Sequence, residues 1–235
     1  MQHKTSLAII EQNISYYNDI APQYNTMVDK DSDKSVRQKV ADKFLNICKN
    51  ATVLDFGGGT GLDLEWLSES NFKIFICEPS KAMREIAIAK NKILANQNVI
   101  FLDDAATDFR QWNHVLPFEE KANAVLANFA VLNCIPDIEL LFSRLALIIK
   151  PQANIIALAL TKDLKKLCRT NFKSFFRSFI YNEPLSINIQ YQNHQQTVYI
   201  YSVPEIIKAS KNDFIFCSSE RLHSSDFTLI HLMRK

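Results

Sequence analysis

Glycine is scarce in this sequence and unevenly placed. Only 4 of the 235 residues are glycine, and all of them lie between residues 57 and 61. The other turns must form without glycine, and asparagine and aspartate are the residues best suited to them. The glycine loop therefore marks a place where the backbone needs a positive φ or close approach to a ligand.

Cysteines are few, and long apolar runs are missing. The five cysteines are odd in number, far apart and without a Cys-x-x-Cys pair, which argues against a disulfide framework and a cysteine zinc site. We expect reduced, buried thiols and no metal centre. The apolar stretch 155–160 is too short to cross a bilayer, and the N-terminus lacks the apolar core of a signal peptide. We expect a cytoplasmic protein with no membrane partner.

A strong charge of either sign is also absent. The 27 basic and 25 acidic residues leave a net charge of +2. Nucleic-acid-binding proteins usually concentrate lysine and arginine on one face. Here these residues are dispersed, apart from a mild cluster over 162–177 that either a solvated helix face or a substrate funnel explains. We predict no nucleic-acid partner.

Apolar runs rich in strand formers alternate with amphipathic segments over the first two thirds of the chain. We expect strands at 52–56, 73–77, 99–102, 122–127 and 154–160, and helices at 9–28, 35–49, 62–69, 80–90 and 138–149. Strands that alternate with helices indicate parallel βαβ units. The predicted fold class is therefore α/β, with a doubly wound sheet.

The last third of the chain breaks this alternation. We expect a helix at 164–180, strands at 186–192 and 196–201, a short helix from the capping box Ser202–Glu205, and final strands at 214–218 and 227–233. No linker separates this part from the rest. We therefore predict a single domain, residues 1–235, with an inserted cap.

The glycine loop follows the expected strand 52–56. A tight strand-to-helix turn needs one glycine, so four favour a bound ligand. The phosphate-binding pattern Gly-Lys-Ser/Thr is absent, and the dinucleotide fingerprint needs a glycine where the chain has Leu62. The loop is instead Asp55-Phe56-Gly57-Gly58-Gly59-Thr60-Gly61.

This loop resembles the first motif of the class I S-adenosylmethionine-dependent methyltransferases, an acid followed by Gly-x-Gly-x-Gly. The resemblance covers residues 16–160 and implies a Rossmann-like methyltransferase fold, with a mostly parallel seven-stranded sheet and a helix and hairpin cap after the fifth strand. It implies S-adenosyl-L-methionine as the cofactor, bound at Asp55, Gly57, Gly58, Gly59 and Gly61. The segments would be a lid (1–34), the cofactor-binding core (35–160), a substrate cap (161–202) and the last helix and strands (203–235).

Two further acids gain roles from the resemblance. Glu78, followed by Pro79, closes the strand 73–77, where the family has an acid that accepts hydrogen bonds from both ribose hydroxyls. A carboxylate can accept two donors, which suits a diol. Capping of the next helix is the alternative role for Glu78. Asp104 matches the family's third acid, which accepts from the adenine amino group. Pro79 and Ala105, the residues that follow the two acids, are expected to bind the cofactor with them.

Some positions around these acids keep more than one interpretation. Asp103 occupies the place of the family's usual glycine, so which aspartate contacts adenine stays open. Asn128, at the end of the fourth strand, lines the cofactor pocket or belongs to a turn. Residues 16–24 resemble the lid helix of small-molecule methyltransferases. Tyr16 and Tyr24 are candidates to reach the carboxylate end of the cofactor, with core packing as the alternative.

The acceptor is expected to be a small molecule. The Asn/Asp-Pro-Pro-Tyr motif of base-methylating enzymes is absent after the fourth strand, and the aromatic tail favours an apolar or aromatic acceptor. In-line displacement requires a base only if the acceptor is protonated at neutral pH. Base candidates are His194 and His223, with surface or structural roles as alternatives. Tyr199 is a third candidate. Its alternative roles are to line the wall of an acceptor pocket, to pack in the core or to form a contact in a homodimer.

Two other functions use the same features. A nicotinamide-dependent oxidoreductase would employ the acid after the second strand, although the loop spacing argues against it. A protein that binds S-adenosylmethionine without turnover would keep the pocket and lack a productive acceptor site.

Overall fold

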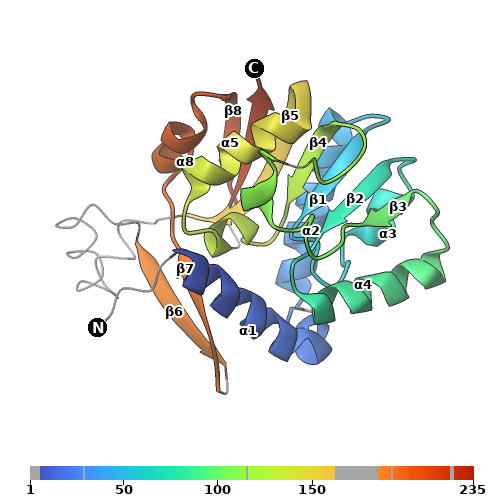
Figure 1. Ribbon diagram of the computed structural model, residues 1–235, viewed down its shortest axis with the longest axis vertical. Coiled ribbons are helices and arrows are strands. Elements are labelled where there is room, and N and C mark those ends of the chain that lie inside the picture. Colours follow the sequence, from blue (N-terminus) through green and yellow to red (C-terminus); the bar gives the residue numbers. More distant parts are fainter. Residues whose placement is uncertain (1–5, 29, 115, 162–184, 192, 223–224) are drawn as a thin grey trace.

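The computed structural model describes residues 6–28, 30–114, 116–161, 185–191, 193–222 and 225–235. A seven-stranded sheet with the order β3-β2-β1-β4-β5-β9-β8 forms its centre (Figure 1). β1 to β5 are parallel, and β9 pairs antiparallel with β5 and β8. The strands are β1 (Thr52–Phe56), β2 (Lys73–Cys77), β3 (Val99–Phe101), β4 (Ala122–Ala127), β5 (Ile149–Leu160), β8 (Phe214–Arg221) and β9 (Phe227–Arg234). The predicted doubly wound, mostly parallel sheet is confirmed.

Helices cover both faces of the sheet. They are α1 (Ser6–Met27), α2 (Asp31–Ile47), α3 (Leu64–Ser68), α4 (Lys81–Leu94), α5 (Ile138–Ile148) and α8 (Val203–Ser210), with the short 3₁₀ helices η1 (Phe109–Gln111) and η2 (Val131–Cys134). Phe44 of α2 and Leu67 of α3 pack in the core on one face, and Phe142 of α5 and Ile206 of α8 pack on the other. No helix in the described part of the chain is both long and apolar enough to span a membrane.

Strand β5 is longer than the sequence suggests. The expected strand begins at residue 154, whereas β5 begins at Ile149, directly after α5. The register with β4 is irregular between Ala122 and Ala124, and Gln152 has a φ of +62°. Pro151 is tolerated inside the strand because it lies at this irregularity, where a proline removes little of the regular hydrogen bonding.

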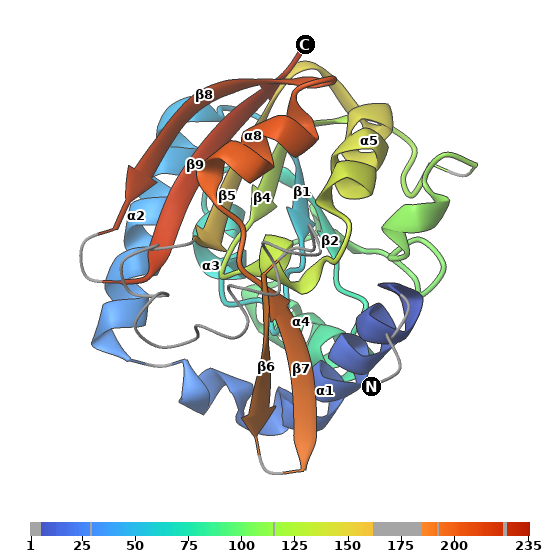
Figure 2. The same cartoon turned by 90° about the vertical axis from the view of Figure 1, so that its left-hand side faces the viewer.

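A two-stranded hairpin stands apart from the main sheet. It consists of β6 (Ser186–Tyr191) and β7 (His194–Tyr199), and α1 packs along β7 (Figure 2). Both lie at the end of the sheet where the parallel strands terminate (Figure 1). The helix expected at 164–180 and the candidate His223 fall outside the described residues.

Asn133 ties the hairpin to the main sheet. Its side chain is fully buried, donates to the main-chain oxygens of Leu160 (2.9 Å) and Tyr199 (2.6 Å), and accepts from Leu160 N at 2.9 Å. The substitution Asn133→Ala leaves these buried backbone groups without a partner. We expect it to lower the free energy of unfolding by about 3 kcal/mol, measured by urea denaturation. Asn212→Ala, at an exposed position, should change it little; an equal midpoint for both variants would contradict the role of Asn133.

Candidate active site

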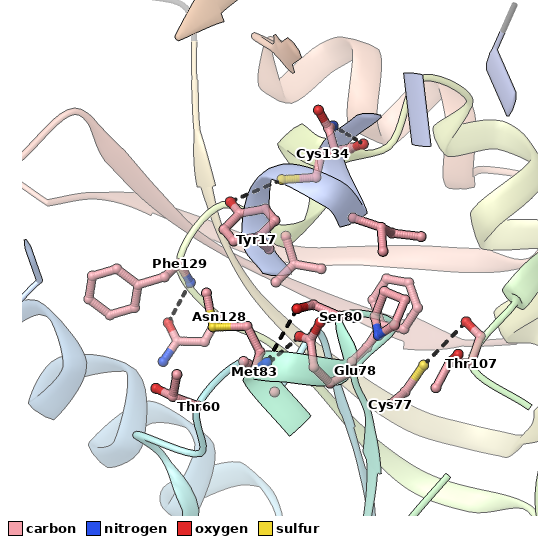
Figure 3. Close-up of a pocket in the computed structure, with 18 of the residues that line it drawn as sticks. Tyr17, Thr60, Cys77, Glu78, Ser80, Met83, Thr107, Asn128, Phe129 and Cys134 are labelled. Carbon is pink, nitrogen blue, oxygen red and sulfur yellow. Dashed lines mark hydrogen bonds between the residues drawn. The ribbon is translucent and has the colours of Figure 1, made fainter. Parts of the chain in front are cut away.

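A cavity of about 380 Å³ lies where β1, β2 and β4 end (Figure 3). The glycine loop after β1 and the segments after β2, β3 and β4 line it, and α1 and η2 contribute the opposite wall. In open α/β sheets, ligands bind in the crevice outside the carboxyl ends of the strands. The volume is also in the range of small-molecule sites. The cavity is therefore the candidate active site.

The glycines of the loop have different surroundings. Gly57 and Gly59 line the cavity and have φ angles of +78° and +56°. A Cβ atom on Gly57 would lie 2.5 Å from Val131 Cγ2, whereas a Cβ on Gly59 would meet no atom of the described residues within 4 Å. Gly61 lies outside the lining, against α3 and α4. The open space at Gly59 is thus where bare backbone permits the closest approach of a ligand.

Glu78 lies at the end of β2 and faces the cavity. Its Oε2 accepts from Gly59 N at 2.9 Å, and its Oε1 accepts from Ser80 N at 2.7 Å. Burial raises the pKa of Glu78 to about 7, and these two hydrogen bonds together with the charge of Arg84 limit the rise. Ser80, rather than Glu78, caps α4 through its side chain. Each carboxylate oxygen keeps acceptor capacity for a further donor.

The two aspartates after β3 have different positions. Asp104 lines the cavity and forms an ion pair with Arg84 of α4. Asp103 Oδ1 accepts from Ala106 N at 2.8 Å, and neither Asp103 nor Ala105 belongs to the described lining. Of the two acids, Asp104 is therefore the one that faces the cavity.

Asp55 is buried behind the loop. A Cβ on Gly58 would lie 2.8 Å from Asp55 Oδ2, so glycine is needed for the loop to pass over this carboxyl. Asp55 Oδ2 has no hydrogen-bond partner among the described residues. Burial raises the pKa of Asp55 well above its usual value, and repulsion from Asp63 and Glu78 adds to the shift.

A polar network joins the loop to β4 and α2. Asp63 accepts from Arg37 Nη1 at 2.8 Å and from Asn128 Nδ2 at 2.9 Å, and Asn128 Oδ1 accepts from Phe129 N at 2.9 Å. The Arg37 guanidinium lies 4.2 Å from the centre of the Phe129 ring. All four residues line the cavity, so Asn128 is both a pocket residue and part of a turn.

The decisive observation comes from a sequence comparison. Residues 28–209, well over half of the chain, match a family model described as a methyltransferase domain. The chain belongs to the methyltransferase domain family. No curated protein sequence matches it.

Solved structures with the same fold include several methyltransferases. A complex described as DhpI with SAM and HEP has a TM-score of 0.71 at 17% identity, covering 99% of this chain and 100% of that one. The 1,6-didemethyltoxoflavin-N1-methyltransferase of Burkholderia thailandensis has a TM-score of 0.70 at 11% identity, covering 100% and 92%. The N-methyltransferase NodS of Bradyrhizobium japonicum has a TM-score of 0.65 at 9% identity, covering 96% and 98%. At such identities these likenesses establish the fold.

The family match and the fold together confirm the expected class. The chain is a class I, S-adenosylmethionine-dependent methyltransferase with a Rossmann-like sheet. The nicotinamide-dependent oxidoreductase considered above is thereby set aside.

Helix α1 of the methyltransferase is pinned over the cavity by three asparagines. Asn13 bonds to both main-chain groups of Thr197 in β7 (2.9 Å each) and to Cys134 O (3.2 Å). Asn18 Oδ1 accepts from Ser80 Oγ at 2.9 Å, and Asn25 bonds to Thr60 in the glycine loop. The helix is therefore tied to the hairpin, to the start of α4 and to the loop itself.

The tyrosines of α1 differ in the direction they face. Tyr24 lines the cavity as expected, but Tyr16 is buried in a cluster with Ile20 and Met83 and does not line it. Tyr17 lies in the cavity instead, with its hydroxyl 3.6 Å from Cys134 Sγ (Figure 3). Sequence reasoning missed Tyr17, although it lies seven residues before Tyr24 and therefore on the same face of a helix.

The two candidate bases that the structure describes, His194 and Tyr199, lie away from the described lining of the cavity. His194 opens β7, rather than lying between the hairpin strands, and its Nδ1 is 2.7 Å from Asp19 Oδ2 of α1. Tyr199 is buried and stacked on Tyr201, with ring centres 6.1 Å apart. Tyr201 donates to Ile135 O at 2.6 Å. These contacts give His194 and Tyr199 structural partners outside the cavity.

Proposed function

We propose that this methyltransferase transfers the methyl group of S-adenosyl-L-methionine to a small molecule held in the cavity under α1. The observation that supports this most is the convergence of the glycine loop, Glu78 and Asp104 on one cavity at the carboxyl edge of the sheet. S-Adenosyl-L-methionine, when bound, supplies a methyl group activated by a positively charged sulfur. The protein then has to bind, orient and exclude water.

The residues around the loop fit a cationic nucleoside. Asp55, Asp63 and Glu78 lie close enough for their charges to raise the pKa of Asp55, so a positive ligand would relieve their repulsion. Asp55 itself lies behind the loop, outside the described lining, and would support Gly58 rather than contact the ligand. An anionic dinucleotide would meet the same acids unfavourably.

Three residues would hold the parts of the cofactor. Glu78 would accept hydrogen bonds from the ribose hydroxyls with the acceptor capacity left on its two oxygens. Asp104 would accept from the adenine amino group. Arg37, a cation in the cavity wall near the glycine loop, would pair with the carboxylate at the amino-acid end, with the lid tyrosine Tyr24 beside it.

The opposite wall suits an acceptor that needs no base. Tyr17, Tyr24 and Cys134 line the cavity, and burial raises the pKa of Tyr17 well above its usual value, of Tyr24 to about 12 and of Cys134 to about 11. These groups stay protonated at neutral pH and can donate a hydrogen bond, but they do not accept a proton. We propose that the acceptor presents an atom that is already unprotonated at neutral pH.

Two features support a small acceptor. The cavity has a volume of about 380 Å³, which has to contain the cofactor and the acceptor or most of them. Helix α1 is also hydrogen-bonded to neighbouring elements at three points along its length. Among the structures of similar fold, the B. thailandensis methyltransferase is described with bound 1,6-didemethyltoxoflavin and S-adenosylhomocysteine. The apolar side chains of Ile14, Phe129 and Ile135 in the wall favour an apolar or aromatic acceptor.

Calorimetry with S-adenosylhomocysteine tests the proposal. We expect binding with a dissociation constant at or below about 100 μM. The corresponding binding free energy is that of a few hydrogen bonds and one ion pair, after the cost of immobilising the ligand is subtracted. NADH, at the same concentration, should give no heat. No binding of S-adenosylhomocysteine at millimolar concentration would contradict the cofactor site. Transfer of labelled methyl to any member of a small-molecule panel would exclude a protein that binds the cofactor without turnover.

A further inference from the structure

Arg84 is a buried cation in an unfavourable position. It lies in the first turn of α4 and is 9% exposed. The positive end of the helix dipole disfavours a cation there, and burial adds a desolvation penalty unless the charge is paired. The first turn of this helix, which the structure describes in full, contains no acidic residue to compensate. A charge kept against both effects requires specific partners.

The partners of Arg84 lie in the two segments that carry the nucleoside acids. Its Nη1 donates to the main-chain oxygen of Glu78 at 2.6 Å, and its Nη2 donates to Asp104 Oδ1. Glu78 and Asp104 line the cavity, whereas Arg84 is absent from the described lining. The guanidinium therefore acts on the cavity through these two residues.

Asp104 depends on this contact for its orientation. Its side chain is 79% exposed and lies in the irregular loop after β3. Exposed side chains ordinarily sample several rotamers, and a fixed guanidinium restricts them. The bond from Arg84 engages Oδ1 and leaves Oδ2 as an acceptor. A rigid planar donor suits this task better than a flexible ammonium does.

We propose that Arg84 is a positioning residue for nucleoside recognition, which holds Asp104 so that the site selects a 6-aminopurine over a 6-oxopurine. The inference rests on the proposed function, in which Asp104 accepts from the adenine amino group. The charge of Arg84 also lowers the pKa of Glu78 against the effect of burial. One cation thus serves both ends of the nucleoside.

Calorimetry with two ligands measures this selection. S-Adenosylhomocysteine carries the purine amino group, and S-inosylhomocysteine has an oxygen in its place. The native protein should prefer the adenine ligand about thirtyfold, because the oxo group sets an acceptor against the carboxylate of Asp104, which is also an acceptor. Arg84→Met, which keeps an unbranched stem but removes the guanidinium, should reduce this ratio about tenfold. A ratio from one preparation is insensitive to a fraction of unfolded protein.

Three further variants separate the outcomes. Lys81→Met removes an exposed cation from the same helical turn and should leave the ratio unchanged. Arg84→Lys serves as a substitute if the methionine variant does not fold. It should lower the ratio about threefold, because one ammonium group does not reproduce the two donors of the planar guanidinium. Asp104→Asn should lose the selection if Asp104 contacts adenine.

Each result has a distinct meaning. Loss of selection in Asp104→Asn, together with the tenfold and threefold reductions of the ratio in Arg84→Met and Arg84→Lys, supports the positioning role. Loss in Asp104→Asn with full selection in the Arg84 variants overturns that role and leaves Asp104 in place. Full selection in Asp104→Asn overturns the adenine contact and the inference with it. No binding of S-adenosylhomocysteine to the native protein overturns the proposed function.

Discussion

Alanine at Gly59 is expected to weaken S-adenosylhomocysteine binding at least about 100-fold while the fold survives. Gly59 has a φ of +56°, so alanine there costs about 1–2 kcal/mol of stability. The added methyl group would meet no atom within 4 Å in the part of the chain that the structure describes. It would occupy space beside the cavity where we place the cofactor. Calorimetry and urea denaturation of the same variant measure both effects.

Gly61→Ala is the matched control for this prediction. Gly61 also has a positive φ, +71°, but its Cβ would lie 2.5 Å from Leu64 Cδ1 and 3.1 Å from Ala87 Cβ. Overpacking adds to the backbone strain, so we expect a loss of about 2–4 kcal/mol in the free energy of unfolding. The folded fraction should bind nearly normally. Native affinity in Gly59→Ala, or lost affinity in a stable Gly61→Ala, would contradict the different roles we assign to these glycines.

The elements of the sheet edge are predictable because they follow strands directly. The sequence places the glycine loop after β1, Glu78 after β2 and Asp104 after β3, and parallel strands bring these ends together. The side chains next to them need only local geometry to reach the cavity. This is why the fold and the core of the candidate site could be inferred from one sequence.

The contribution of α1 is harder to predict because it depends on the phase of the helix. Neighbouring residues differ by about 100° around the axis, so Tyr16 and Tyr17 face different surroundings. The cavity-facing residues follow the helical spacing i, i+3, i+4, i+7 and i+14, and are Ile10, Asn13, Ile14, Tyr17 and Tyr24. This stripe mixes apolar and polar side chains, and only the docking of α1 on the hairpin and α4 shows which face is inward.

The turn after β4 could not be predicted from residue type. Turns without glycine were expected to use asparagine or aspartate, and Asn50 and Asn71 do have positive φ angles. Phe129 and Ala130, however, adopt φ angles of +49° and +66° beside the cavity. Surrounding contacts compensate for such strain, here the bonds of Phe129 N to Asn128 Oδ1 and of Ala130 N to Leu158 O.

Replacement of Glu78 by glutamine is expected to weaken S-adenosylhomocysteine binding about 100-fold at pH 8, the equivalent of about two charge-assisted hydrogen bonds. Glutamine keeps the size of the side chain but offers one acceptor oxygen instead of two. Glu85→Gln, at an exposed position of α4, provides a matched control and should bind normally. Native affinity in Glu78→Gln would show that the ribose is held elsewhere.

The pH dependence distinguishes the charge of Glu78 from its shape. The folded, ligand-free protein has a Glu78 pKa of about 7, raised from 4.5, and the ionised form is the better acceptor. Below pH 7 the native affinity should therefore fall about tenfold per pH unit, whereas Glu78→Gln should show little change between pH 6 and 8.

The stability of the folded protein should depend on pH in the opposite direction to its affinity for the ligand. Because the pKa of Glu78 is higher in the folded than in the unfolded state, its contribution to stability is complete below pH 4.5 and is lost as the pH rises through 7. The loss is about 3 kcal/mol, and Glu78→Gln should lack it, so urea denaturation at pH 4.5 and pH 8 should give a smaller difference in the variant. Ionised Glu78 should therefore lower the stability of the protein at the same pH at which it binds the ligand best. This combination is expected for an acid whose role is to bind a ligand. Equal pH dependence of stability in the two proteins would refute the raised pKa, and with it the link between ionisation and affinity.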